Sequence, residues 1–222
     1  MAKFIEHNSI QAKKKSFWYF FFKRAFDIFF SFLFLVLFSW FLIIIGLLVF
    51  FTNPGHIIFF DKRIGKNGKT ISVWKFRSMY ADSETRPEKY LNEKQLEQWK
   101  RERKVLNDPR ITPFGRFLRK TSIDELPQFV NIFIGNMSFV GPRPITAAEI
   151  EENFTEEQKE VLFQAKPGLT GLWQVSGRSD VTWESGDRQK LELQYLQTRG
   201  IGKDLAILFK TIPAVLNKKG AH

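Results

Sequence analysis

The longest uninterrupted apolar stretch of the chain covers residues 28–51, where no ionisable side chain occurs. Only Ser31, Ser39 and Gly46 interrupt its aliphatic and aromatic side chains. About 24 residues with a rise of about 1.5 Å each would cross a bilayer core of about 30 Å. A cleaved signal peptide would have a shorter apolar region followed by a small-residue cleavage site, and no such site follows here. A buried core helix of this length would be unusual, so the pattern predicts a membrane-embedded helix.

Basic residues lie on both sides of this apolar stretch. The residues before it are Lys13, Lys14, Lys15, Lys23 and Arg24, and those after it are Lys62, Arg63 and Lys66. Cytoplasmic flanks are enriched in lysine and arginine, so a helix that enters the membrane and returns would suit both flanks. A return needs a break in the helix, and Ser39-Trp40 is the candidate near the middle, although serine alone bends a helix only weakly. The pattern alone leaves a single span and a re-entrant hairpin open.

The remaining pattern predicts a small domain of mixed α/β class that is mostly helical. Residues 52–55 form a turn, and strands over 57–64 and 70–76 form a short β-hairpin. We expect helices over 83–105, 114–118, 125–134, 149–164, 188–197 and 203–216, with a loop over 167–177 and Pro213 ending or kinking the last helix. That last helix is amphipathic, so it either packs on a core or lies in the membrane interface. The predicted division is a basic leader (1–22), a membrane-embedded segment (23–55) and a cytoplasmic domain at the membrane surface (56–222).

The composition of the chain excludes several classes of catalytic and metal site. The 222 residues include no cysteine, which excludes disulfides, thiolate catalysis and cysteine metal sites. The net charge of +11 attracts anionic lipid, nucleic acid or phosphorylated ligands without choosing among them. The three histidines have no metal-ligand spacing, and neither a Walker A motif nor a Ser-His-Asp arrangement is evident. Carboxylate and arginine chemistry remain.

The segment 117–127 contains the strongest candidate for that chemistry. Ser122 and Glu125 have the spacing of a capping box, so one interpretation is purely structural, with Ser122 capping a helix and Asp124 and Glu125 complementing its dipole. The functional interpretation is that Asp124 is ionised and attacks phosphorus, as in an aspartyl-phosphate intermediate. Arg119 and Lys120 would then hold the phosphate oxygens.

Two further segments carry cations in restricted positions. Lys75 and Arg77 lie two residues apart at the end of a predicted strand, on one face. Arg143 stands between Pro142 and Pro144, which restrict the backbone and would preorganise its guanidinium for an oxyanion. Taken singly, each segment would equally suit an exposed ion pair or a plain turn.

Together these segments resemble one family, the monotopic bacterial phosphoglycosyl transferases, also called bacterial sugar transferases. Seven ordered motifs carry the resemblance, at residues 23–27, 75–79, 108–115, 118–128, 135–144, 166–171 and 174–178. The family's membrane segment often breaks at Ser-Pro, whereas Trp40 follows Ser39 here. The resemblance favours the re-entrant topology, with both ends of the segment in the cytoplasm.

The resemblance implies transfer of a sugar-1-phosphate from a UDP-sugar to polyprenol (undecaprenyl) phosphate, with release of UMP. This reaction initiates exopolysaccharide, capsule or O-antigen synthesis at the bacterial inner membrane, with the catalytic domain facing the cytoplasm. The implied nucleophile is Asp124, which would form a covalent phosphosugar and bind Mg²⁺, and Glu125 would assist it. The implied substrate-binding residues are Lys75, Arg77, Arg119, Arg143 and Arg178.

The implied partners are the UDP-sugar donor, the polyprenol phosphate acceptor and membrane lipids, with no nucleic acid; a homodimer stays open. The charged stretch 86–104 and residues 177–180 resemble members that handle galactose or glucose phosphate. A membrane-anchored basic scaffold that binds anionic lipid or nucleic acid without catalysis is the rival from another class. An enzyme that moves a bare sugar is a second rival.

Overall fold

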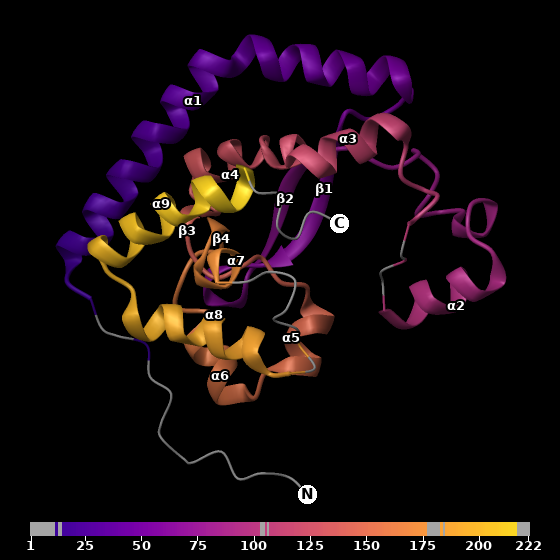
Figure 1. The fold of residues 1–222 in the computed structure, drawn as a ribbon. Helices are drawn as coiled ribbons and strands as arrows, with labels where there is room; N and C mark the ends of the chain where they lie inside the picture. The colour runs from indigo at the N-terminus through magenta and orange to yellow at the C-terminus, as the bar shows by residue number, and fades with distance from the viewer. Residues whose placement is uncertain are drawn as a thin grey trace, which may run out of the picture. The chain divides into compact units, whose positions relative to one another are not determined.

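The computed structural model describes residues 12, 15–102, 105, 107–176, 183 and 185–216 (Figure 1). In this part of the chain the fold is mixed α/β and mostly helical, as predicted. The elements in chain order are α1 (Phe17–Thr52), β1 (Ile58–Ile64), η1 (Lys66–Gly68), β2 (Thr70–Phe76), η2 (Pro87–Lys89), α2 (Glu93–Glu102), α3 (Pro113–Thr121), η3 (Ile123–Glu125), α4 (Gln128–Ile134), β3 (Ser138–Val140), α5 (Ala147–Asn153), α6 (Glu156–Leu162), β4 (Gly168–Thr170), α7 (Leu172–Val175), α8 (Asp187–Thr198) and α9 (Ile201–Leu216).

The chain divides into two compact units. Among the described residues, those within 12–31, 62–73 and 131–216 form the first unit, and those within 32–61 and 74–130 form the second. Both α1 and the hairpin of β1 and β2 therefore contribute residues to each unit. The two hairpin strands pair and are joined by only five residues, so they run antiparallel.

The helix α1 is long and apolar enough to cross a membrane. It is helical throughout, including at Ser39 and Trp40, the candidate position for the break that a re-entrant hairpin would need. The hydroxyl of Ser39 donates a hydrogen bond of 3.0 Å to the carbonyl of Val36. A serine bond of this kind can bend a helix without ending it. Large apolar side chains along the helix are exposed, such as Ile43 at 62%, which suits contact with lipid more than with a protein core.

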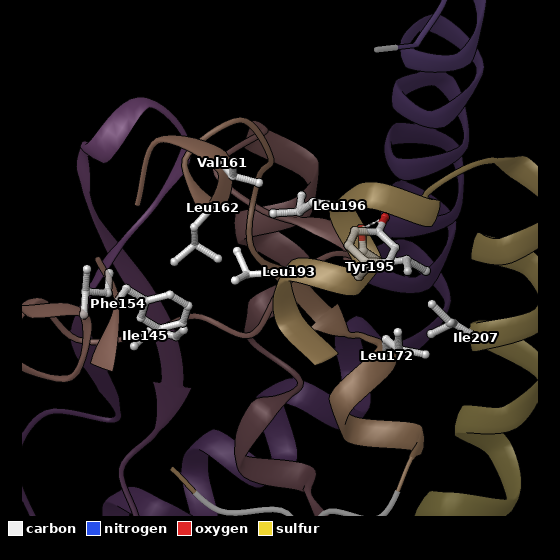
Figure 2. Close-up of a cluster of buried hydrophobic side chains, with 11 residues drawn as sticks. Ile145, Phe154, Val161, Leu162, Leu172, Leu193, Tyr195, Leu196 and Ile207 are labelled. Atoms are coloured by element: carbon white, nitrogen blue, oxygen red, sulfur yellow. Dashed lines mark hydrogen bonds between the residues drawn. The ribbon is translucent and has the colours of Figure 1, made fainter. Parts of the chain in front are cut away.

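The core of the first unit joins α5, α6, α7, α8 and α9 to the loop after β3. Its buried side chains include Ile145, Phe154, Leu193, Leu196 and Ile207 (Figure 2). The strands β3 and β4 pair in parallel next to this core, with Ser138 opposite Gly168 and Val140 opposite Thr170. This parallel pair was not predicted, and residues 167–177, expected to be a loop, contain both β4 and α7.

The start of α1 is fixed within the first unit by polar contacts. Lys23 forms an ion pair of 2.7 Å with Asp204 of α9, and the Tyr19 hydroxyl donates to the same carboxylate at 2.9 Å. Asp27 is only 3% exposed, and its carboxylate accepts hydrogen bonds from the backbone N–H of Phe139 and from the Ser138 hydroxyl. These contacts join the N-terminal turns of α1 to β3 and α9.

Several predicted helix boundaries were wrong. The single helix expected over 149–164 is two helices, because Thr146 and Thr155 each form a capping box and Phe154 between them is extended. The helix expected over 83–105 is confined to α2, and the one expected from residue 125 begins at 128. By contrast, the helix predicted over 203–216 is confirmed as α9, which continues through Pro213 to Leu216; of the two roles expected for this proline, ending the helix is excluded.

The core of the second unit is formed by Ile45 and Val49 of α1, Phe76 of β2 and Leu118 of α3. Leu118 is completely buried. This cluster packs α3 against α1 and the end of β2, and the residues that follow β2 and α3 carry the candidate chemistry.

Candidate active site

The position of α3 is determined by a close approach to the segment after β2. Thr112 caps α3 by accepting a hydrogen bond of 2.8 Å from the N–H of Gly115, and Pro113 occupies the first turn. A Cβ atom on Gly115 would lie 1.9 Å from the carbonyl oxygen of Ser78. Only glycine therefore allows α3 to pack this closely on Ser78, which explains this part of the motif at residues 108–115.

Arg119 lies one turn after Gly115 on the same helix. Its Nε donates a hydrogen bond of 2.8 Å to the hydroxyl of Ser78. Burial lowers the pKa of Arg119, and the negative charge of Asp124 opposes that shift. The motifs at residues 75–79 and 118–128 therefore meet at this hydrogen bond, which holds a partly buried guanidinium whose charge acts on Asp124.

Ser122 ends α3 in the left-handed conformation, with φ of 57°, and its N–H donates to the carbonyl of Arg119. Its side chain makes no cap hydrogen bond at the start of η3. The capping box suggested by the Ser122–Glu125 spacing is therefore wrong. Instead, the turn at Ser122 redirects the chain so that Asp124 and Glu125 follow directly on the short helix η3.

Asp124 is partly buried, and burial is the main cause that raises its pKa to about 6. The neighbouring charge of Glu125 raises it further, whereas the positive charges of Lys75 and Arg119 lower it. The sequence predicted an ordinary anion stabilised by a helix dipole. The structure shows a carboxylate of raised pKa that is still mainly ionised at neutral pH.

The two cations of the motif at residues 75–79 have different surroundings. Lys75 forms an ion pair of 2.8 Å with Asp61 and also acts on the charge of Asp124. The guanidinium of Arg77 donates to the backbone carbonyl of Asn53, and a Cβ atom on Gly55 would lie 2.6 Å from its Nη1. Arg77 therefore contacts the turn after α1, and Lys75 is one of the cations around Asp124.

A buried ion pair supports the start of α3, and sequence analysis gave it no role. The carboxylate of Asp108 accepts hydrogen bonds from Nε and Nη2 of Arg110, at distances of 2.6 to 3.1 Å. Both side chains are about 95% buried, and the Arg110 guanidinium stacks over Trp99 at 5.0 Å. A bidentate pair of this kind fixes the loop that leads to the Thr112 cap.

Arg143 belongs to the first unit. Its N–H donates a hydrogen bond of 3.0 Å to Glu192, which is completely buried, and its guanidinium lies 5.3 Å from the ring of Trp173. Arg188 was not predicted, although its guanidinium lies over the rings of both Trp173 and Trp183, at 4.4 and 4.0 Å. Arg178, the remaining predicted site residue, lies outside the described residues.

Asp124 and its neighbour Glu125 supply two of the ligands that a magnesium ion needs. No group of three or more histidine or acidic side chains gathers in the part of the chain that the structure describes. Magnesium is usually held by one or two carboxylates together with substrate phosphates and water. Asp124 and Glu125 supply two carboxylates whose mutual repulsion raises the pKa of Asp124, and a cation would relieve this repulsion.

Comparison with known proteins gives a consistent set of relatives. The family model "Bacterial sugar transferase" matches residues 18–218. An exopolysaccharide production protein ExoY from Rhizobium meliloti (strain 1021) is 41% identical over 202 residues, which cover 90% of this chain and 88% of that protein.

Two relatives are named by reaction. An undecaprenyl-phosphate galactose phosphotransferase from Salmonella typhimurium is 41% identical over 204 residues, which cover 91% of this chain and 42% of that protein. A UDP-glucose:undecaprenyl-phosphate glucose-1-phosphate transferase from Escherichia coli (strain K12) is 39% identical over 204 residues, which cover 90% of this chain and 41% of that protein. This chain spans less than half the length of these two proteins.

Proposed function

Since the chain belongs to the bacterial sugar transferase family and is a sugar-phosphate transferase, we propose that it transfers a sugar-1-phosphate from a UDP-sugar to undecaprenyl phosphate and releases UMP. The observation that carries this proposal is the carboxylate of Asp124, with Glu125, Lys75 and Arg119 acting on its charge. Relatives with names in exopolysaccharide production and in galactose and glucose phosphate transfer support a role in polysaccharide synthesis with one of these sugars.

The proposed first step is attack by a carboxylate oxygen of Asp124 on the phosphorus that carries the sugar. A bond forms between that oxygen and phosphorus, the bond from this phosphorus to the bridging oxygen of the diphosphate breaks, and UMP leaves with both electrons. The product is a phosphosugar joined to Asp124 as an acyl phosphate, a mixed carboxylic–phosphoric anhydride. In the second step a phosphate oxygen of the polyprenol phosphate attacks the same phosphorus and releases the Asp124 carboxylate.

The surrounding charges fit this sequence of steps. Attack by one anion on another is opposed by repulsion, and Arg119 and Lys75 lower this barrier by placing positive charge beside Asp124. The Ser78 hydroxyl holds Arg119 through Nε, so its terminal nitrogens face the phosphate oxygens in our proposal. Asp124 and Glu125 would hold a magnesium ion, which when bound supplies further neutralisation of phosphate charge.

Incubation with a panel of UDP-sugars, magnesium and undecaprenyl phosphate tests the reaction. We expect UMP in solution and, when the acceptor is omitted, a chain whose intact mass is increased by one phosphosugar. Release of UDP instead of UMP would show transfer of a bare sugar and would overturn the proposal. No adduct and no turnover with any donor would favour the basic scaffold.

A matched pair of variants assigns the nucleophile. Asp124→Asn keeps the side-chain shape but cannot form the acyl phosphate, so we expect neither adduct nor product. Asp187→Asn removes a carboxylate that is 52% exposed, forms an ion pair with Lys190 and has no role in the proposed reaction, so we expect full activity. An adduct on the Asp124→Asn variant would refute the assigned role.

We propose that α1 re-enters the cytoplasmic face of the inner membrane. The basic flanks and the back-bonded Ser39 support this topology. Because the chain contains no cysteine, single cysteines at exposed Ser16 and Asn92 can be labelled with an impermeant maleimide in sealed vesicles. Labelling of both sites from the same side is expected, and labelling from opposite sides would indicate a single span.

A further inference from the structure

A basic cavity of about 240 Å³ lies in the first unit, beside the first turns of α1. It is lined by the N-terminal part of α1, the η1 turn, β3, the loop before β4 and the end of α8. Its wall carries five basic side chains and one carboxylate: Lys23, Arg24, Lys66, Lys166, Arg199 and Asp27. The transfer reaction proposed above gives these residues no role.

The acidic groups near the cavity already have partners. The Asp27 carboxylate accepts hydrogen bonds from the Phe139 N–H at 3.0 Å and the Ser138 hydroxyl at 3.2 Å. Lys23 is paired at 2.7 Å with Asp204. The Asp27 carboxylate also acts on the charges of Lys23, Arg24 and Lys166. Because the wall carries five basic side chains and one carboxylate, positive charge is nevertheless in excess around the cavity.

Two lysines carry this excess charge. Neither Lys66 nor Lys166 forms an ion pair with a residue that the structure describes. A Cβ atom on Gly135 would lie 3.0 Å from Nη2 of Arg24 and 3.3 Å from Nζ of Lys166, so these two cations converge on one point of the backbone. Partial burial, followed by the charges of Arg24 and Lys66, lowers the pKa of Lys166. A bound anion would stabilise all three cations.

The wall also has an apolar part. Phe20, Val140 and Ala165 line the cavity together with the basic groups, and Lys66 and Arg199 lie 6.0 and 5.5 Å from the centre of the Phe20 ring. An apolar wall beside a cluster of cations suits an amphiphile with a phosphate better than a small hydrated ion. The volume is slightly below the range of about 300–1,000 Å³ for pockets that enclose drug-sized ligands, so it accommodates a headgroup rather than a whole lipid.

The position of the cavity beside the first turns of α1 indicates which kind of molecule supplies the phosphate. The lining residues of α1 immediately precede the apolar stretch 28–51, and Phe17, Trp18 and Phe21 of the same turns are more than half exposed. Exposed aromatic residues at the end of a membrane helix lie at the level of the lipid headgroups. We propose that the basic cavity binds the phosphate of an anionic phospholipid headgroup, with Lys66 and Lys166 as its main charge contacts. This proposal depends on the membrane location of α1 and not on the transfer reaction.

Binding of short-chain lipids to the full chain in detergent tests the proposal. The probes are dihexanoyl phosphatidylglycerol, dihexanoyl phosphatidylcholine and inorganic phosphate, and native mass spectrometry counts the bound molecules. We expect one saturable phosphatidylglycerol per chain, with much weaker binding of phosphatidylcholine. Equal binding of the two lipids would overturn the proposal. Inorganic phosphate that displaces phosphatidylglycerol and binds with the same affinity as this lipid would overturn it as well.

A charge-matched pair of double variants locates the site. In Lys66→Gln with Lys166→Gln we expect phosphatidylglycerol affinity to fall about fivefold per lysine, or roughly 25-fold in total. Exposed Lys69 lies three residues from Lys66 and does not line the cavity, so Lys69→Gln with Lys94→Gln removes the same charge and should retain binding. Arginine at both cavity positions should restore affinity. An equal loss in both double variants would show a diffuse charge effect and refute the site.

UMP release and intact-mass adduct formation, measured on the same variants, separate this inference from the transfer proposal. Neither cavity lysine is assigned a role in the reaction. Loss of lipid binding with adduct formation retained is the expected result for the cavity variants.

Discussion

Replacement of Asp124 by asparagine should raise the stability of the fold while it abolishes transfer. The carboxylate is held in surroundings that favour its neutral form, because burial and the charge of Glu125 together raise its pKa to about 6. An asparagine at this position has similar shape and no charge. The substitution therefore removes an unfavourable interaction that the folded state contains only when Asp124 is ionised.

The size of the gain follows from the pKa. An aspartate has a pKa of about 3.9 in an unfolded chain, and each pKa unit corresponds to about 1.4 kcal/mol, so a folded value of about 6 costs at most about 3 kcal/mol when Asp124 is ionised. Solvent reaches part of the side chain and reduces this figure, so we expect a gain of about 1–2 kcal/mol at pH 8.

The sign of the pH dependence is fixed by the direction of the shift. Because the folded pKa is raised, the folded state holds its proton more tightly than the unfolded state. The contribution of Asp124 to the free energy of unfolding is fully present below about pH 4 and is lost as the pH rises through about 6. The asparagine variant does not titrate, so its advantage over the wild type should be large at pH 8 and small at pH 4.

Urea unfolding of both proteins in the same detergent, followed by tryptophan fluorescence at pH 4, 6 and 8, measures this difference. Asp187→Asn is the matched control, since its exposed carboxylate has a lowered pKa because of hydrogen bonding with Lys190, and its replacement should bring no gain at pH 8. A variant at position 124 that is no more stable than the wild type at pH 8 would refute the reasoning. A gain that is the same at pH 4 and pH 8 would refute it as well.

Three other substitutions follow from the same site. Glu125→Gln should lower the pKa of Asp124, so the acid limb of the rate profile against pH should move to lower pH; an unchanged or upward-shifted limb would contradict the charge coupling. Gly115→Ala would place a methyl group 1.9 Å from the carbonyl oxygen of Ser78, and we expect a loss of at least about 1–3 kcal/mol in urea unfolding, together with reduced turnover. Asp108→Asn leaves its buried arginine partner without a counter-charge and should cost about 3–5 kcal/mol in the same assay; a near-neutral effect would show that the pair does not support α3.

The elements that were predicted well from the sequence are determined by residues within the element itself or next to it. The stretch 28–51 contains no ionisable residue, so its helix is specified by composition alone. The second hairpin strand was predicted with its observed bounds, since residues 70–76 follow a Gly-containing turn and are rich in β-forming side chains. The closeness of Lys75 and Asp124 was implied only by the family resemblance, because the strand pattern says nothing about a residue 49 positions further along the chain.

The elements that sequence analysis missed depend on contacts between distant residues. The pairing of Ser138 with Gly168 joins two three-residue strands that are 30 residues apart, and each strand is too short to show a period of its own. The spacing of Ser122 and Glu125 matched a capping box, yet Ser122 adopts a left-handed conformation because α3 ends there. The place of Arg188 between two tryptophan rings is likewise a result of tertiary packing.

The contacts of α1 with α9 have a consequence for biosynthesis. Tyr19 leaves the ribosome before its hydrogen-bond acceptor Asp204, which follows 185 residues later. At about 5–20 residues per second, about 10–40 s separate the two. During that interval Lys23 lacks Asp204, and Asp27 lacks its partners in β3 until Ser138 and Phe139 have been added, so water or lipid headgroups solvate these side chains in the meantime. The contacts that fix the first turns of α1 are therefore completed only after α9 has been synthesised, and a chain truncated before α9 would lack the contacts of Tyr19 and Lys23 with Asp204.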